Sequence, residues 1–421
     1  MKLAIKRHNR KISGCLLAIG LFFSSFSNAQ VLSLDSILAM IDTNNPMLQE
    51  YDYNAKALDE YSNGATRWMA PMIGAGTFMT PYKRREGMHE ADKGAWMFSV
   101  EQEIPNPAKL AANKHYLRSR SGLEKEGRAI AFNNLRAEAR TYYYQWIVAE
   151  KKMSVLHQQE EIIGLMLKLA RIRHPYNQGS VGNIYKAEGR LAEVQNMILM
   201  THSVIQDNRY RLQSLTNLSP NDSIMVDTTT VNFHLPDLLE DTAGLGTRRS
   251  DIRQINRSIE IMRLNQQFQK QQAKPDFRIR FDHMRSIGDM PNQFTAMAMI
   301  SIPIAPWSSK MYRAEVKAMT YNIEAMKKGR EAILLEKKGM LTGMARQLTS
   351  MKQQLTNYET RIIPALRRNH QTVLLAYEEN REQLPMVIDA WEALNMSQMD
   401  YLDKLEEYYK MIVAYEKEIE K

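Results

Sequence analysis

The sequence predicts a mainly α-helical protein with a small β part, built from a repeat of about two hundred residues that occurs twice. Two long stretches have a heptad pattern of apolar residues, two pairs of short segments alternate between apolar and polar residues, and the same order of segments returns in the second half. The 421 residues are 44% hydrophobic and 24% charged, which is typical of an ordered protein. The mean hydropathy is -0.45 and the longest apolar run, 14–26, is too short to span a bilayer, so a polytopic helical membrane protein is excluded.

The first 29 residues have the pattern of a signal peptide. Five basic residues and no acidic ones precede an apolar segment, and small residues occupy Ser27 and Ala29, just before Gln30. The basic residues are Lys2, Lys6, Arg7, Arg10 and Lys11. We therefore expect 1–29 to be a signal peptide that directs secretion and is cleaved before Gln30.

The formal charge of +9 comes largely from that segment. Of the 56 basic residues, five leave with it, so the mature chain has 51 basic and 47 acidic residues and a formal charge of +4. This small excess argues against a nucleic-acid partner. The single cysteine, Cys15, precedes the apolar segment instead of following it, which favours an unmodified thiol over a lipoprotein site.

The sequence contains no catalytic or metal-binding motif. Without Cys15 the mature chain has no thiol, and the nine histidines form no H-E-x-x-H pattern. Methionine sulfur suits soft metal ions, but two of the 28 methionines, Met344 and Met351, occupy heptad positions where methionine serves as packing. We expect no cofactor and no enzymatic activity.

The first repeat is predicted to span 30–217. It begins with a helix, continues through two extended segments, 72–80 and 96–103, and then a long helix, 107–176, and ends with a turn and a shorter helix. The stretch that follows, 218–246, is polar and rich in Ser, Asp, Thr and Pro, which is typical of a linker.

The second repeat is predicted to span 247–421 in the same order. A helix begins at Ser250, extended segments follow at 275–284 and 294–304, a long helix begins at Ser308, and a turn leads to the last helix. The landmarks that recur about two hundred residues apart are Pro71 with Pro275, and Tyr176 with Tyr377.

Each long helix contains a coiled-coil seam of apolar residues at heptad spacing. The first seam comprises Phe132, Leu135, Ala139, Tyr142, Trp146, Ala149, Met153, Leu156, Ile163, Leu167 and Ala170, and the second comprises Leu334, Leu341, Met344, Leu348, Met351, Leu355, Tyr358, Ile362 and Ala365. At about 1.5 Å per residue, the helix 107–176 would be about 105 Å long, which indicates a rod or tube.

The extended segments have one apolar and one charged face. Phe277, Ile279 and Phe281, for example, alternate with charged residues. Strands of about ten residues with this pattern suit a membrane β-barrel with a wet interior. The charges predicted to line that interior, and to balance each other, are Glu101, Glu103, Arg278 and Arg280. Four strands cannot close such a barrel, so we expect three copies to contribute twelve strands.

This organisation resembles the TolC-like family of outer-membrane efflux proteins, over essentially the whole mature chain. Short motifs that occur in the family's order carry the resemblance. They are Asn44-Asn45-Pro46, Tyr176-x-x-Gly179, Lys274-Pro275-Asp276, Ile302-Pro303-Ile304, Ile363-Pro364-Ala365 and Val387-Ile388-Asp389-Ala390.

The resemblance implies a homotrimer whose twelve-stranded barrel, surrounded by outer-membrane lipid, continues as a helical tube through the periplasm. It also implies a passive exit duct that works with a periplasmic adaptor protein and an inner-membrane transporter, such as one of the resistance-nodulation-division type. The exported cargo would be small molecules or metal ions.

The resemblance further suggests residues for the periplasmic end. The gate candidates are Tyr377, Glu382 and Asp389, and the turns that would dock the adaptor contain Tyr176, Gly179, Ser180, Asn380 and Arg381. Three Asp389 carboxylates around a narrow pore would attract cations and repel anions. Met386 stands where the family often has a second aspartate, and Glu382 where it has a basic residue. An ordinary surface role for Asp389 has equal weight at this point.

A soluble periplasmic coiled-coil adaptor or spacer protein is the competing class. The β-domains of an adaptor would need many more strand residues than this chain offers. A soluble β-domain of that kind also does not require strands with Phe277, Ile279 and Phe281 on one face and charged residues on the other. The extended segments therefore favour the duct.

Overall fold

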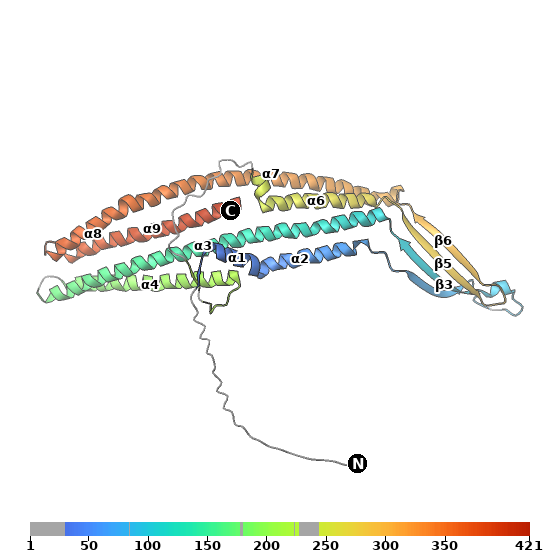
Figure 1. The fold of residues 1–421 in the computed structure, drawn as a ribbon, viewed down its shortest axis with the longest axis horizontal. Coiled ribbons are helices and arrows are strands. Elements are labelled where there is room, and N and C mark those ends of the chain that lie inside the picture. The colour runs from blue at the N-terminus through green and yellow to red at the C-terminus, as the bar shows by residue number, and fades with distance from the viewer. Residues whose placement is uncertain (1–29, 84, 177–179, 223, 227–243) are drawn as a thin grey trace, which may run out of the picture.

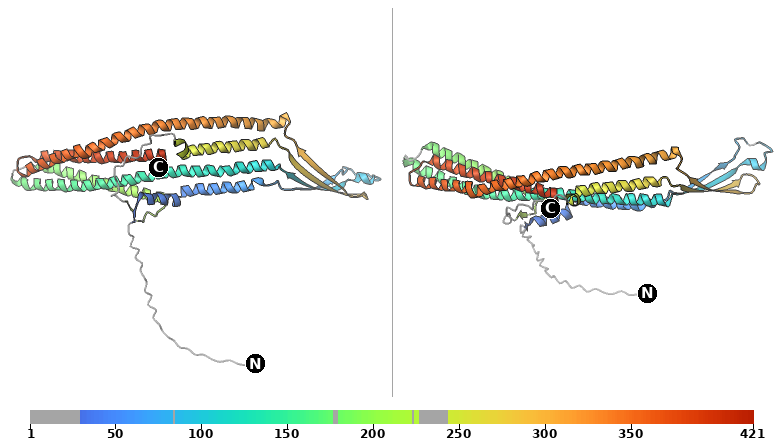
Figure 2. Two further views of the ribbon diagram at one scale, coloured as in Figure 1. Left: turned by 45° about the horizontal axis from the view of Figure 1, so that its top comes forward. Right: turned by 90° about the horizontal axis from the view of Figure 1, so that it is seen from above.

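The computed structural model describes residues 30–83, 85–176, 180–222, 224–226 and 244–421. These form an elongated molecule, with a bundle of long helices that carries a sheet at one end (Figure 1, Figure 2). The predicted signal peptide, Cys15, Gly179 and most of the predicted linker lie outside the described residues.

The helices and strands follow the order that the sequence predicts. The elements of the first half are β1 (Gln30–Leu32), α1 (Leu34–Asn44), α2 (Pro46–Asn63), β2 (Met72–Phe78), β3 (Ala95–Ile104), α3 (Pro107–Arg173), α4 (Val181–Thr216) and β4 (Ile224–Val226). Those of the second half are α5 (Leu245–Arg248), α6 (Ser250–Gln271), β5 (Asp276–Ser286), β6 (Gln293–Ser301), α7 (Pro306–Asn357), α8 (Ile363–Glu378) and α9 (Leu384–Ile419).

Each half has one long helical rod with two shorter helices placed end to end along it (Figure 1). In the first half α2 and α4 both pack on α3, and in the second half α6 and α9 pack on the rod formed by α7 and α8. The two halves meet because α3 also contacts α6 and α9. With 67 residues, α3 is about 100 Å long. The predicted fold class, mainly helical with a small antiparallel sheet, is confirmed.

Asparagine followed by proline starts two of these helices. Asn45 and Asn106 accept hydrogen bonds from the backbone N–H of Met47 and Ala108, each at 3.0 Å, and proline occupies the next position. The prediction of a single first helix was wrong, because Asn45 has an extended backbone and separates α1 from α2.

The first predicted seam is packed inside the bundle, and so is the second as far as Leu355, whereas its last members, Ile362 and Ala365, are exposed. Leu135, Ala139, Trp146 and Ala149 of α3 belong to a core that also includes α1 and α4. Residues of α7 and α9 form a second core, in which Leu348 is fully buried. The main buried members of this second core are Leu341, Leu348, Leu355, Leu402, Leu405 and Tyr408.

A π-helical turn separates α7 from α8. It spans Tyr358–Ile362 and lies directly before Pro364. Proline has no N–H and its ring collides with the carbonyl one turn earlier, so a regular α-helix cannot continue through it without adjustment. The wider turn provides that adjustment, and the rod continues.

The sheet has the strand order β2-β3-β5-β6, with all neighbours antiparallel. The register places Val100 opposite Phe281 and Ile104 opposite Phe277, on one apolar face. The side chains of that face remain 43% to 53% exposed in the protomer at Trp96, Phe98, Val100, Phe277, Ile279 and Phe281. Among the described strands, β2 and β6 each have a neighbour on one side only. No helix in the described part of the chain is long and apolar enough to cross a bilayer.

A second, two-stranded sheet was not predicted. β1 pairs in parallel with β4, with Val31 opposite Met225. β4 lies within the stretch 218–246 that the sequence predicts to be a linker, and α5 begins in its last two residues. Strands of three residues are too short to show a period in the sequence, which explains why they were missed.

Polar groups join the end of α9 to the start of α6. The guanidinium of Arg249, only 7% exposed, pairs with Asp251 at 2.7 Å and with Glu418 at 2.8 Å. Glu420 accepts hydrogen bonds from the backbone N–H and the hydroxyl of Ser250, at 2.7 and 2.6 Å. Because these groups are half-buried, they act in a lower dielectric than exposed pairs do. They hold the middle of the second half together.

The Arg249 cluster predicts a pH dependence of stability. Burial alone would raise the pKa of Asp251, but the hydrogen bonds and charge of Arg249 outweigh it and lower that pKa. The ionised carboxylate therefore stabilises the fold above about pH 4, and this contribution is lost as the pH falls through the lowered folded-state value. Asp251→Asn should lower the thermal midpoint, followed by helical circular dichroism, at pH 7, and the difference from the wild type should shrink below about pH 4. Asp400→Asn, at an exposed site, is the control; an equal effect of both substitutions at pH 7 would contradict the prediction.

Candidate functional site

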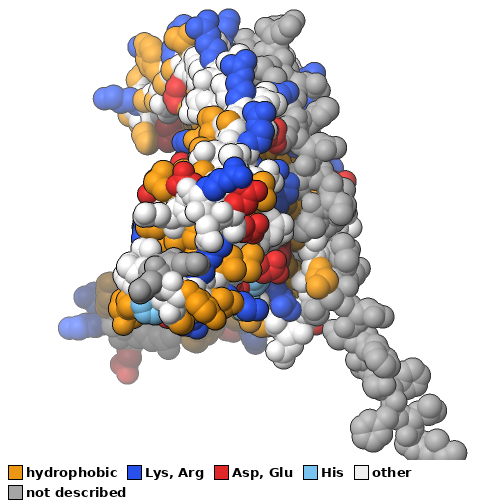
Figure 3. All heavy atoms as spheres, turned by 90° about the vertical axis from the view of Figure 1, so that its left-hand side faces the viewer, with side chains coloured by type: hydrophobic (Ala, Val, Ile, Leu, Met, Phe, Trp, Pro, Cys, Tyr) orange, Lys and Arg blue, Asp and Glu red, His pale blue; other side chains and the backbone are white. Residues whose placement is uncertain are grey.

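The end of the bundle opposite the sheet contains the two long turns. One joins α3 to α4, and the other joins α8 to α9 (left-hand end of Figure 1). Figure 3 looks onto this end and shows basic and acidic side chains side by side, with hydrophobic ones between them. The candidate residues at this end fall into three groups: a buried contact, a polar cavity and exposed ion pairs.

The α8–α9 turn is tight and closed by backbone hydrogen bonds. The N–H groups of Arg381 and Glu382 both donate to the carbonyl of Ala376, at 2.8 and 3.2 Å. Asn380 has a positive φ of 61°, a conformation that asparagine tolerates better than most residues. The sequence therefore specifies a short, well-defined turn after α8.

Tyr377 is buried at this turn, where it holds Arg173 from the last turn of α3. The guanidinium carbon of Arg173 lies 4.2 Å from the centroid of the Tyr377 ring, in a cation–π contact. The same guanidinium donates hydrogen bonds to the carbonyls of Tyr377 and Glu378, at 2.8 and 3.1 Å. Tyr377 itself is 3% exposed. Arg173 thus joins the two halves of the chain at their common end.

A polar cavity of about 640 Å³ lies beside this contact. It brings together residues from both turns, including four of the gate and docking candidates. Its lining includes Arg173, Ser180, Asn183, Tyr377, Asn380 and Glu382. The structure therefore places Ser180 of the first half next to Tyr377, Asn380 and Glu382 of the second.

Asp389 does not lie in that cavity. It is on α9, 59% exposed, and its carboxylate pairs with Lys186 of α4 at 2.7 Å. One helical turn along both helices, Arg190 pairs with Glu392. Hydrogen bonds from Arg190 to Glu193 and Glu392 raise the pKa of Arg190. These pairs tie α4 to α9 just above the turns.

The remaining docking candidates are exposed. Tyr176 lies in a 3-10 turn after α3 and is 74% exposed, and Arg381 pairs with Glu379 at 3.1 Å on the surface of the turn. Exposed pairs of this kind contribute about 0–1 kcal/mol each. They are free to exchange partners when another protein binds.

The charged face of the sheet forms a separate group. Arg278 pairs with Glu101 at 3.0 Å and lies 3.8 Å from Glu103, while Arg280 pairs with Asp282 at 3.0 Å. Arg280 also lies 3.9 Å from Glu101. The four predicted charges therefore pair within the protomer, while their place in a barrel lumen stays a prediction. Asp282, which completes this network, was not singled out from the sequence.

Sequence reasoning missed the partners at the turns. Arg173 and Lys186 lie on different helices from Tyr377 and Asp389, about two hundred residues away in the chain. No local pattern marks them, because a lone cation in a helical repeat has the appearance of a solvated side chain. Among the described residues, no group of three or more His, Cys, Asp or Glu side chains is arranged to bind a metal ion.

The Arg173 contact can be tested by hydrogen exchange. Arg173→Ala removes two charge-assisted hydrogen bonds to the α8–α9 turn, and each such bond contributes about 1.5–3 kcal/mol. Backbone amides of 377–384 should then exchange about tenfold faster or more. Arg171→Ala is the matched control, since Arg171 is 60% exposed and pairs with Glu188 on α4. Equal protection of the turn in both variants would show that Arg173 does not hold it.

Comparison with known proteins relates the chain to a set of solved structures. No protein-family model matches the sequence, and no curated protein does. A structure of CusC superposes with a TM-score of 0.73 at 12% identity, covering 95% of each chain. The outer-membrane channel OprN gives 0.72 at 15% identity, covering 92% of this chain and 89% of that one. The CmeC outer-membrane channel of Campylobacter jejuni gives 0.71 at 12% identity, covering 99% and 93%. The chain therefore has the fold of the TolC-like outer-membrane channels.

Proposed function

We propose that this chain is one subunit of a homotrimeric exit duct in the outer membrane. The observation that carries the proposal is the four-stranded sheet, which has an exposed apolar face, a charged face and one unpaired side at each outer strand. Two further observations support the duct. The sheet is attached to a long helical bundle, and the chain is similar to outer-membrane channels along nearly its whole length.

The sheet requires partners if it lies in lipid. Backbone N–H and C=O groups at an open edge have no water to bond with in a bilayer, so β2 of one subunit must pair with β6 of the next. Three subunits would then give a closed barrel of twelve strands, with Phe277, Ile279 and Phe281 facing lipid. Glu101, Glu103, Arg278 and Arg280 would line the lumen, where their mutual pairing leaves little net charge.

The helical part would form the periplasmic tube. In this proposal the chain is a secreted protein whose leader, 1–29, is removed, and 30–217 and 247–421 are two repeats joined by 218–246. The tube would meet a periplasmic adaptor protein at the turns that contain Tyr176, Gly179, Ser180, Asn380 and Arg381. An inner-membrane transporter, in one version of the resistance-nodulation-division type, would supply small molecules or metal ions, and the duct itself would pass them without chemistry.

The same turns would close the tube when no transporter is engaged. Tyr377, held by Arg173, and Glu382, which lines the polar cavity, are positioned to fix the α8–α9 turn. Asp389 would face the constriction, where Lys186 neutralises part of its charge. Opening would then require the α4–α9 pairs and the Arg173 contact to change partners.

Cysteine cross-linking tests the barrel. The natural chain has one cysteine, Cys15, so introduced pairs can be read without interference once the leader is gone. Ala75→Cys on β2, combined in turn with cysteine at each outward position of β6, should give covalent trimers in the outer-membrane fraction after oxidation, because only the β2–β6 junction between subunits is close enough. The β6 positions are Phe294, Ala296, Ala298 and Ile300.

Val100→Cys with the same β6 positions is the control for this experiment. Val100 lies on β3, and β5 separates β3 from β6, so no disulfide should form within or between subunits. Recovery of the mature wild-type protein in the soluble periplasm would overturn the duct and favour a coiled-coil adaptor or spacer.

Substitution of the two partners at Asp389 tests the gate. In planar bilayers, Asp389→Ala should weaken cation selectivity and block by multivalent cations, because it removes three carboxylates from the ring. Lys186→Ala should have the opposite effect, since it releases those carboxylates from their ion pairs. Opposite signs for the two variants are expected. If conductance and block are unchanged in both variants, Asp389 is an ordinary surface residue and not part of a gate.

A further inference from the structure

A small cavity lies at the hairpin end of the sheet, on the charged face. The register places Phe78, Ala95 and Ser286 in one row across three strands, and Met284 with Gln293 in the next row on the same face. Side chains two residues apart along a strand point to the same face, and Ala95 on β3 and Met284 on β5 therefore share their face with Glu101 and Arg280. The first two rows, with loop residues above them, line a cavity of about 130 Å³ that is open to solvent on one side.

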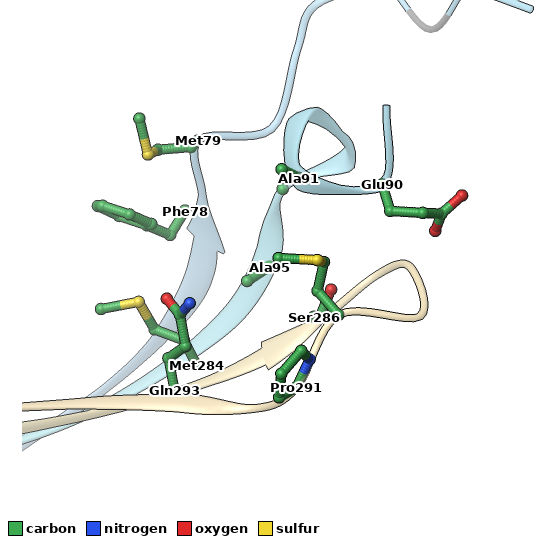
Figure 4. A pocket seen from close by; sticks show the side chains of 11 residues that line it. Phe78, Met79, Glu90, Ala91, Ala95, Met284, Ser286, Pro291 and Gln293 are labelled. Carbon is green, nitrogen blue, oxygen red and sulfur yellow. The ribbon is translucent and has the colours of Figure 1, made fainter. Parts of the chain in front are cut away.

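The lining is mixed, with an aromatic ring and three methionines beside polar groups. Phe78, Met284 and Gln293 project to the same side of the strands, with Met79 beside Phe78 (Figure 4). Thioether groups contact aromatic rings favourably, by about 0.3–1.5 kcal/mol per contact. The polar side chains of the lining are Ser286, Gln293 and Glu90. The other lining residues are Ala91, Gly94, Ala95, Met290 and Pro291.

The loops that cover the cavity are fixed to each other. Glu90 accepts a hydrogen bond from the N–H of Asp289 at 2.9 Å and pairs with Lys93, and its carboxylate points away from Phe78 and Met284 (Figure 4). The N–H of Ile287 donates to the carbonyl of Gly94 at 3.1 Å. Gly94 has a φ of 81°, and a Cβ there would lie 2.7 Å from Thr80, so only glycine permits this closure. The cavity is therefore a built feature of two hairpins.

We infer that this cavity binds small uncharged aromatic molecules of about the size of a phenol. Cavities of about 150 Å³ with apolar walls accept benzene, which sets the size class. The Phe78 ring and the methionine sulfurs can pack against the aromatic ring of a ligand. Ser286 or Gln293 can form a hydrogen bond with a single hydroxyl group on that ring. The one charged lining residue, Glu90, is already engaged by Lys93 and Asp289, so a charged ligand would gain nothing from it.

The consequence for transport rests on the proposed duct, but the binding itself does not. If the charged face lines the lumen, the cavity lies at the outer mouth, where aromatic cargo would pause before leaving. Binding there must be weak, because a site that conducts has to release its occupant.

The test uses the full-length protein in detergent and 4-fluorophenol, observed by ¹⁹F NMR against empty micelles. Ala95→Leu fills the cavity and should weaken binding at least tenfold. Ala298→Leu makes the same change on the opposite face of the sheet, opposite Ile279, and should leave binding as in the wild type. The charged probe 4-fluorobenzoate should bind more weakly than the phenol to the wild type.

Met290→Ala is the second variant, because Met290 lies in the β5–β6 loop and its truncation leaves every strand intact. It should weaken binding about threefold or more. Equal binding by wild type and Ala95→Leu, or equal loss in Ala95→Leu and Ala298→Leu, would overturn the inference. If the protein forms conducting trimers but does not bind the phenol, the cavity is not a binding site and the proposed duct is unaffected. Protein that binds the phenol but never enters a membrane refutes the duct and leaves the site.

Discussion

The packing of α3 is the feature on which the other parts of this molecule depend. At its first turn, Asn106 donates a hydrogen bond to the carbonyl of Pro275 and accepts one that caps the helix, while Lys109 pairs with Asp276 at 2.5 Å. At its last turn, Arg173 holds the α8–α9 turn. One helix therefore fixes the sheet at one end and the two long turns at the other. A shift of α3 along its axis would have to break both sets of contacts.

Local patterns in the sequence were sufficient for the long elements. A heptad seam and a strand alternation each repeat many times, so occasional exceptions such as Glu160 do not hide them, and Asn106-Pro107 marks the start of α3 within one residue. The three-residue strands β1 and β4 contain too few residues for any period. Nor does a local pattern reveal Lys186 beside Asp389, because their contact exists only once α4 and α9 lie side by side.

The ion pairs on the sheet differ from those near the turns, and this difference bears on where ion selectivity would arise in the proposed duct. On the sheet, Arg278 and Arg280 face Glu101, Glu103 and Asp282, so that face presents nearly balanced charge. Beside the turns, Lys186 of α4 pairs with Asp389 of α9, and their side chains are 37% and 59% exposed. Exposed pairs are worth about 0–1 kcal/mol and are easily exchanged. In the proposed duct, a change of net charge would therefore cost least near the turns, where a gate could alter selectivity without disturbing the sheet.

The proposed duct and the inferred binding cavity would impose opposite demands on the same wall, and they lie at different places on the charged face of the sheet. The middle of the charged face has paired ions, in which Arg278 and Arg280 contact Glu101, Glu103 and Asp282. The cavity near Phe78 has a mixed polar and apolar lining, and it is small and open to solvent on one side, so it can bury only part of a ligand. Burying about 100 Å² of apolar surface contributes roughly 2.5 kcal/mol, before the entropy lost on binding is subtracted. Residence in such a site is brief, which is compatible with export in a way that a deep, enclosed pocket would not be.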